Sequence, residues 1–205
     1  MTMKFYMTPG SCSTGIHILL EEAGLVFEAH ILNLPRGDHL APEYLAINPH
    51  GTIPTLLRDD GTALCDFVSI AIWLAEAYPR RKLLPPPGET RDAALAMLEF
   101  CTRHIHGDAF RRVFTPERFT SAQGLEAVKA EGVQMAAAAF DSVSLDLNGK
   151  PFVTGEFSIA DAALFYVEFW GVKIGMTLPP NLLAHYERMK ARPAVRQVLA
   201  EEGYR

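Results

Sequence analysis

A proline inside an apolar run constrains this chain more than any other feature. Residues 47–57 read Ile-Asn-Pro-His-Gly-Thr-Ile-Pro-Thr-Leu-Leu, so Pro54 interrupts the entrance to an otherwise buried strand. Proline lacks the N–H that a strand interior needs, and the Ile53-Pro54 step therefore predicts a bend with a cis peptide bond. We expect this bend to turn a backbone edge outward, where an extended peptide could pair with it.

A cysteine between two hydroxyl residues follows the first predicted strand. Ser11, Cys12 and Ser13 connect the apolar run 4–7 to residues 13–23, which carry apolar side chains at helical spacing. A helix N-terminus favours an anion, which predicts a lowered pKa for the Cys12 thiol and the ability to form a mixed disulfide. The alternative reading is a small residue packed at the turn. Ser11 and Ser13 are candidate donors to a thiolate, and Ser13 is equally a candidate N-cap.

The order of predicted elements in residues 1–80 is that of a thioredoxin-like fold. An Asp60-Gly61 turn indicates a hairpin, and a helical crossover makes the first two strands a parallel pair. The expected strands are 4–7, 26–32, 55–58 and 62–65, and the expected helices are 13–23, 42–47 and 67–78. The sequence therefore predicts a βαβαββα domain.

A proline-rich segment separates this domain from a region of different composition. Residues 85–88 read Pro-Pro-Pro-Gly, which excludes a regular element and predicts a linker over 81–90. Residues 91–205 are rich in Ala, Leu, Met and Glu and predict an all-helical domain. Ser158 and Asp161 form a capping-box pattern within it. Its helices are expected near 91–114, 120–145, 158–172 and 179–190, with one more after Pro193.

Composition excludes several function classes. A net charge of −5 gives no electrostatic reason to expect nucleic acid or anionic membranes as partners. We find neither a signal peptide nor an apolar run long enough to span a membrane. Three widely spaced cysteines, Cys12, Cys65 and Cys101, argue against a disulfide framework and against a zinc cluster. We therefore expect a cytoplasmic protein that acts on small molecules and holds no metal.

These motifs together resemble the glutathione transferase superfamily over the whole chain. The resemblance rests on the motifs Asn48-Pro49-x-Gly51-x-x-Pro54, Phe157-Ser-Ile-Ala-Asp161 and Arg192-Pro-Ala-Val195. The run Tyr6-x-x-Pro-Gly-Ser-Cys-Ser13 is most similar to the bacterial beta class. The resemblance implies glutathione as co-substrate, a small hydrophobic or electrophilic second substrate, a role in detoxification and a homodimer.

The resemblance also implies roles for individual residues. Ile53, held by Pro54, would offer its backbone to the cysteinyl part of glutathione, while Asp66 and Phe67 would take the γ-glutamyl end. Cys12 or Ser11 would hold the sulfur as a thiolate. His106 fits the histidine that the beta class carries early in its helical domain. The residues expected to line the acceptor site are Met7, Phe110, Trp170 and Lys173.

One pair of residues departs from the family pattern. The family usually has Glu or Gln followed by Ser where this chain has Asp66 and Phe67. Losing a hydrogen bond to a charged ligand group costs about 1.5–3 kcal/mol, which weakens the expected glutathione binding. Two other readings stay open: thiol–disulfide chemistry with Cys12 as nucleophile, and a binding or interaction protein that has lost its glutathione site.

Overall fold

Four strands form one mixed sheet in a computed structural model that describes residues 2–204 of the chain. The strands are β1 (Met3–Met7), β2 (Phe27–Ile31), β3 (Thr55–Leu57) and β4 (Ala63–Leu64), in the order β2-β1-β3-β4. β1 pairs with β2 in parallel and with β3 in the antiparallel sense, and β3 and β4 form the predicted hairpin. The predicted thioredoxin-like topology is confirmed.

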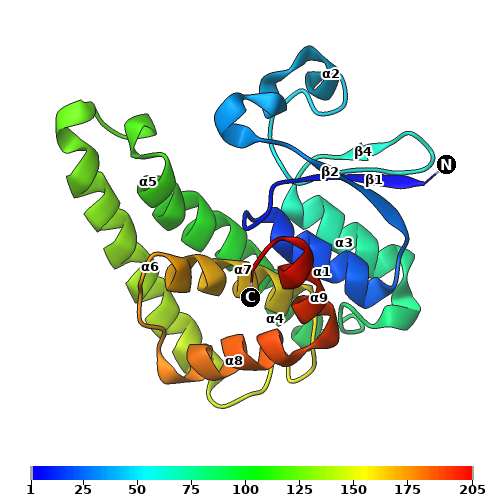
Figure 1. The fold of residues 1–205 in the computed structure, drawn as a ribbon. Coiled ribbons are helices and arrows are strands. Elements are labelled where there is room, and N and C mark those ends of the chain that lie inside the picture. Colours follow the sequence, from blue (N-terminus) through cyan, green and yellow to red (C-terminus); the bar gives the residue numbers. More distant parts are fainter. Residues whose placement is uncertain (1, 205) are drawn as a thin grey trace. The chain divides into compact units, whose positions relative to one another are not determined.

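Three helices complete this part of the fold. They are α1 (Ser13–Ala23), α2 (Pro42–Leu45) and α3 (Phe67–Ala77), accompanied by the 3-10 turns η1 (Leu34–Arg36), η2 (Asp38–Leu40) and η3 (Pro79–Arg81). α1 ends as predicted at Gly24, whose left-handed conformation lets its N–H bond the carbonyls of Leu20 and Glu21. α1 and α3 pack together on one side of the sheet, and α2 lies on the other (Figure 1).

The structure separates into two compact units. The first contains the residues up to Pro85 together with those from Lys190 onward, and the second contains Pro86–Met189. The composition of residues 91–205 predicts that this whole segment belongs to the helical domain. In the structure, α9 (Pro193–Glu201) packs on α1 instead, with Val195, Val198 and Leu199 buried on one face. Helical spacing reveals such a face but does not say what covers it.

The second unit is helical. Its helices are α4 (Glu89–Glu99), the π-helical segment η4 (Phe100–Phe110), α5 (Arg111–Phe114), α6 (Leu125–Leu147), α7 (Ile159–Lys173) and α8 (Pro180–Ala191), with 3-10 turns η5 (Pro116–Arg118) and η6 (Ala122–Gly124). α7 is buried along most of its length and packs against α4 and η4, so it forms the core of this unit. Among residues 2–204, no helix is long and apolar enough to cross a membrane.

A buried polar network anchors the start of α7. The predicted capping box is present, with the Ser158 N–H donating to the Asp161 carboxylate over 2.8 Å. His185 is fully buried between Asp161 and Glu168, and its Nδ1 lies 2.9 Å from the Glu168 carboxylate. Burial by itself would lower the pKa of His185, but the Glu168 and Asp161 carboxylates outweigh it and raise the pKa to about 9.

Candidate functional site

The loop that precedes β3 has the backbone bend predicted from the sequence. The Ile53-Pro54 peptide bond is cis. The buried Asn48 amide holds the loop, because its Nδ2 donates to the Thr52 carbonyl and to the Thr55 hydroxyl, each over 2.9 Å. This network fixes the backbone on both sides of Ile53.

Two further residues define the same loop. Tyr44, from α2, donates its hydroxyl to the Thr52 carbonyl and lies 2.8 Å from the Thr55 hydroxyl. Gly51 has a φ of 58°, and a Cβ there would come within 3.1 Å of the His39 carbonyl oxygen. The glycine is therefore required both by its backbone conformation and by the space around it.

The hydroxyls of the Thr8–Ser13 turn bond to one another. Ser13 Oγ donates to the Thr8 carbonyl over 3.0 Å and accepts from the Thr8 N–H, so it closes the turn between β1 and α1. Ser11 Oγ lies 2.6 Å from Ser13 Oγ and also accepts the Ser13 N–H. Ser13 is buried and structural, whereas Ser11 is partly exposed.

Cys12 corrects a prediction made from its position at the start of α1. Its side chain is 7% exposed, and its Sγ–H donates to the Ile53 carbonyl oxygen over 3.6 Å. Burial raises the pKa of the Cys12 thiol to about 12, against a smaller opposite effect of backbone N–H groups. The helix N-terminus was expected to lower this pKa, but desolvation is the larger effect, so Cys12 is a thiol near neutral pH.

The first turn of α3 carries the residues that depart from the family pattern. Asp66 is an exposed N-cap whose carboxylate accepts the Ser69 N–H over 2.8 Å and the Ser69 hydroxyl over 2.5 Å. Phe67 is 6% exposed, so its side chain is part of the packed interior. The N-terminus of α3 would stabilise an anion near this turn. The Asp66 carboxylate could bind a neighbouring cation.

Met7, the other predicted site residue of this unit, lies at the end of β1. Its side chain is 2% exposed, and its carbonyl accepts the Leu32 N–H over 2.9 Å. Met7 therefore packs in the interior, directly before the Thr8–Ser13 turn.

Glu202 supports the same turn and was missed in the sequence analysis. Its buried carboxylate accepts the Gly10 N–H over 2.8 Å and the Thr14 hydroxyl over 2.7 Å, and contacts His17 Nδ1 at 2.9 Å. The Tyr204 hydroxyl occupies the position that a Cβ on Gly10 would need. Gly10 and Glu202 are 192 positions apart, and no local pattern connects them.

In the second unit, three predicted site residues come together in an aromatic cluster. The His106 ring lies 4.8 Å from the Trp170 ring, and Trp170 lies 5.4 Å from Phe110, between ring centroids. His106 Nδ1 is 3.3 Å from the Tyr166 hydroxyl. Burial, and secondarily Arg111, lowers the pKa of His106 to about 4, so the imidazole is neutral at pH 7.

Lys173 lies in a different environment from Trp170, although both were expected to line the acceptor site. Lys173 is exposed, and its Nζ lies 5.9 Å from the centroid of the Phe169 ring. Trp170 is 6% exposed and faces the aromatic cluster. A spacing of three residues puts side chains on neighbouring parts of a helix surface, but a long lysine extends to solvent.

Comparison with known proteins agrees with this geometry. Residues 10–77 match the family described as glutathione S-transferase, N-terminal domain. Glutathione S-transferase GstA of Escherichia coli O157:H7 is 33% identical over 98% of this chain and 99% of its own. A glutathione transferase homologue from Sulfitobacter, solved with bound glutathione, is 27% identical, with a TM-score of 0.92 over 98% of both chains. The beta-class glutathione S-transferase of Sphingomonas chungbukensis is 29% identical, with a TM-score of 0.85 over 98% of both chains.

The likeness extends over both units and includes relatives that bind glutathione. It also reaches the beta class, to which the Tyr6–Ser13 run is similar. The chain belongs to the glutathione S-transferase family of enzymes.

Proposed function

We propose that this chain binds glutathione through its first unit and joins the glutathione sulfur to a small electrophile. The observation that carries the proposal is the hydrogen bond from the Cys12 Sγ–H to the Ile53 carbonyl, which holds the Ile53 backbone beside the Thr8–Ser13 turn. An extended tripeptide would pair with Ile53 as an added strand. Its γ-glutamyl carboxylate would lie at the start of α3, with its ammonium on Asp66.

The reaction is a substitution at the electrophile. The glutathione thiolate attacks an electron-poor carbon, a carbon–sulfur bond forms, and the leaving group departs with the bonding electron pair. The protein contributes by holding the thiolate and orienting it. We assign the thiolate contact to the Ser11 hydroxyl and the Cys12 Sγ–H, each of which would exchange its present partner for the ligand sulfur.

The structure favours Cys12 as a hydrogen-bond donor over Cys12 as a nucleophile. A thiol with a pKa of about 12 has almost no thiolate at pH 7, and the thiolate is the reactive form. The rival thiol–disulfide reaction through Cys12 is therefore the second candidate. Within the second unit, His106 is neutral and suited to hydrogen bonding, and it lies in the aromatic cluster with Phe110 and Trp170.

The test uses two substrates, a chlorodinitroarene and a glutathione mixed disulfide, together with a glutathione column. With glutathione and a chlorodinitroarene, the proposal predicts chloride release and a thioether product. Turnover of a glutathione mixed disulfide alone, lost in Cys12→Ser, would support the thiol–disulfide reaction instead. Retention on a glutathione column without either activity would support a binding protein, and failure to bind glutathione would reject the enzyme.

We also infer, from the family, that the chain acts as a homodimer in the cytoplasm. The three cysteines are free, which fits a reducing compartment. Sedimentation should give twice the chain mass of 22.6 kDa, and a single-chain mass at micromolar concentration would contradict the dimer.

A further inference from the structure

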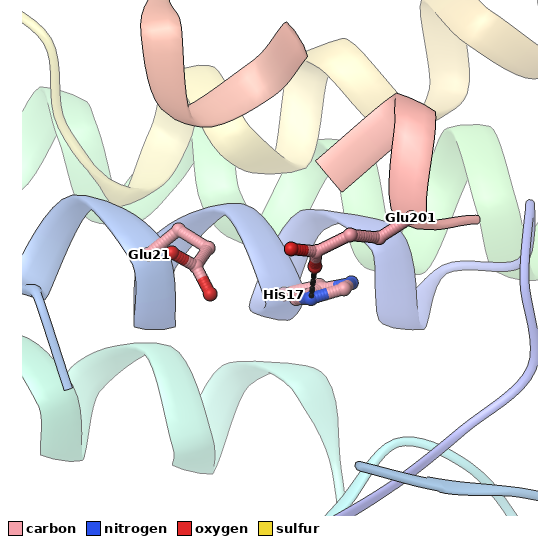
Figure 2. Close-up of side chains that lie close together, drawn as sticks. All are labelled: His17, Glu21 and Glu201. Carbon is pink, nitrogen blue, oxygen red and sulfur yellow. Dashed lines mark ion pairs between the residues drawn. The ribbon is translucent and has the colours of Figure 1, made fainter. Parts of the chain in front are cut away.

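A histidine and two glutamates gather where α9 ends against α1. His17 and Glu21 lie four residues apart on α1 and share one helix face, and Glu201 is the last residue of α9. One ligand atom from each lies within 4.8 Å of the others, and within residues 2–204 no other set of three or more meets this criterion. Figure 2 shows His17 in contact with Glu201, and Glu21 one turn further along α1.

His17 is buried, and a carboxylate bound to its Nδ1 fixes the orientation of the ring. Its Nδ1 lies 2.9 Å from Glu202, whose side chain is 1% exposed and already accepts two donors, the Gly10 N–H and the Thr14 hydroxyl. Glu202 therefore acts as acceptor and His17 Nδ1–H as donor. Metal-binding histidines are typically held in this way, because a second carboxylate fixes the tautomer and leaves the other nitrogen to bind the metal.

The other ring nitrogen faces a second carboxylate. His17 Nε2 lies 3.2 Å from Glu201 Oε2. Two lone pairs facing each other at this distance repel, so a positive charge, either a proton or a cation, belongs between these atoms. Gln197 donates to the other oxygen, Glu201 Oε1, over 2.9 Å, which keeps Oε2 turned to His17.

We propose that His17 Nε2, Glu21 and Glu201 form a site for a divalent cation of the zinc type. One imidazole and two carboxylates are donors that zinc accepts, whereas calcium and magnesium prefer oxygen ligands throughout. Zinc bonds of about 2.0–2.2 Å require the ligand atoms to approach to about 3.3 Å. Rotation of the Glu201 side chain, which is 48% exposed, and of the half-buried Glu21 provides this movement.

The surroundings give the cation room and access. A cavity of about 320 Å³ is bordered by His17, Glu21, Glu201 and Glu202. It can hold the water that completes the coordination of a three-residue zinc site. The bound cation would cross-link α1 to α9 and, through Glu202, support Gly10 in the turn that carries Cys12.

This site is separate from the proposed glutathione contacts, so either proposal can fail without the other. The expectation of no metal came from the spacing of the cysteines. It did not consider His17, whose partners lie at the far end of the sequence.

The test is titration of the metal-free protein with Zn²⁺, followed by calorimetry and by the melting temperature. We expect one saturable site per chain and a rise in melting temperature at saturation. Glu201→Gln and Glu21→Gln should each weaken binding, and the double variant should lose it by at least about 100-fold. Both glutamates reach solvent, so these variants should fold. The matched control is Glu28→Gln, which removes the carboxylate of another histidine pair, His30 and Glu28, and should bind Zn²⁺ as the original chain does.

Two results would overturn the site. One is the absence of saturable Zn²⁺ binding by the original chain. The other is undiminished binding by the double variant, because the metal would then occupy other groups, such as the partly exposed Cys65 thiol. Co²⁺ gives a second readout, since its visible spectrum should report nitrogen and oxygen ligands and should change in Glu201→Gln.

Discussion

The Cys12 Sγ–H donates to the carbonyl oxygen of Ile53, linking the start of α1 to the cis bend before β3 over 3.6 Å. The two residues are 41 positions apart, and each belongs to a motif that we expected to contact glutathione. The contact brings the Thr8–Ser13 turn beside the backbone edge that would bind the tripeptide.

The Cys12 thiol should react slowly with iodoacetamide at pH 7. Burial raises the pKa of Cys12 to about 12 and also raises that of Cys101 well above its usual value, while Cys65 is partly exposed and has a smaller upward shift. Labelling followed by mass spectrometry should find Cys65 modified first, at a rate that increases with pH. Fast labelling near pH 7 that stops in Cys12→Ser would contradict this account.

Asp66 should have two separable roles. Asp66→Ala removes the N-cap of α3 and should lower the free energy of unfolding by about 1 kcal/mol, and it should also weaken glutathione binding. Asp66→Asn keeps an acceptor for the Ser69 N–H and should be nearly as stable, yet should bind glutathione as weakly as Asp66→Ala. If Asp66→Asn binds like the original chain, the carboxylate charge does not contact the ligand.

Phe67 marks the departure from the family serine. Phe67→Ser should tighten glutathione binding by about 1.5–3 kcal/mol, because it supplies a hydroxyl at the γ-glutamyl carboxylate. The ring is buried, so the same variant should lose about 3 kcal/mol of stability. Phe67→Ala is the control, because it removes the ring without adding a hydroxyl. Equal affinities of the two variants would mean that the hydroxyl contributes nothing.

The second unit should become less stable as the pH rises above neutrality. The folded-state pKa of His185 is raised from 6.5 to about 9, so its stabilising contribution is complete below pH 6.5 and is lost as the pH rises through 9. Thermal unfolding between pH 6 and pH 9.5 should show a loss of roughly 3 kcal/mol. Glu168→Gln removes the principal charge that raises this pKa, and an equally steep pH dependence in that variant would contradict the assignment.

Local patterns were sufficient to predict most of the fold. The bend before β3 was predicted from Pro54, and the end of α1 was predicted from Gly24. The hairpin was predicted from Asp60-Gly61, and the start of α7 from Ser158 and Asp161. In each case the sequence signal and the structural consequence lie within a few residues of each other. The strand order follows from the same elements and the rule for crossovers.

Long-range contacts and burial could not be predicted in the same way. Glu202 supports Gly10 from the other end of the chain, and α9 packs on α1, although composition groups α9 with the helical region. The position of Cys12 at a helix start predicted a lowered pKa, and this was wrong because burial of the thiol has the larger effect. The buried partners of His185 likewise come from a different helix.

Calorimetric titration of the original chain with reduced glutathione tests the central claim most directly. We predict saturable binding at one site per chain, weakened in Asp66→Ala. The absence of binding by the original chain, at glutathione concentrations up to the millimolar range, would contradict the account.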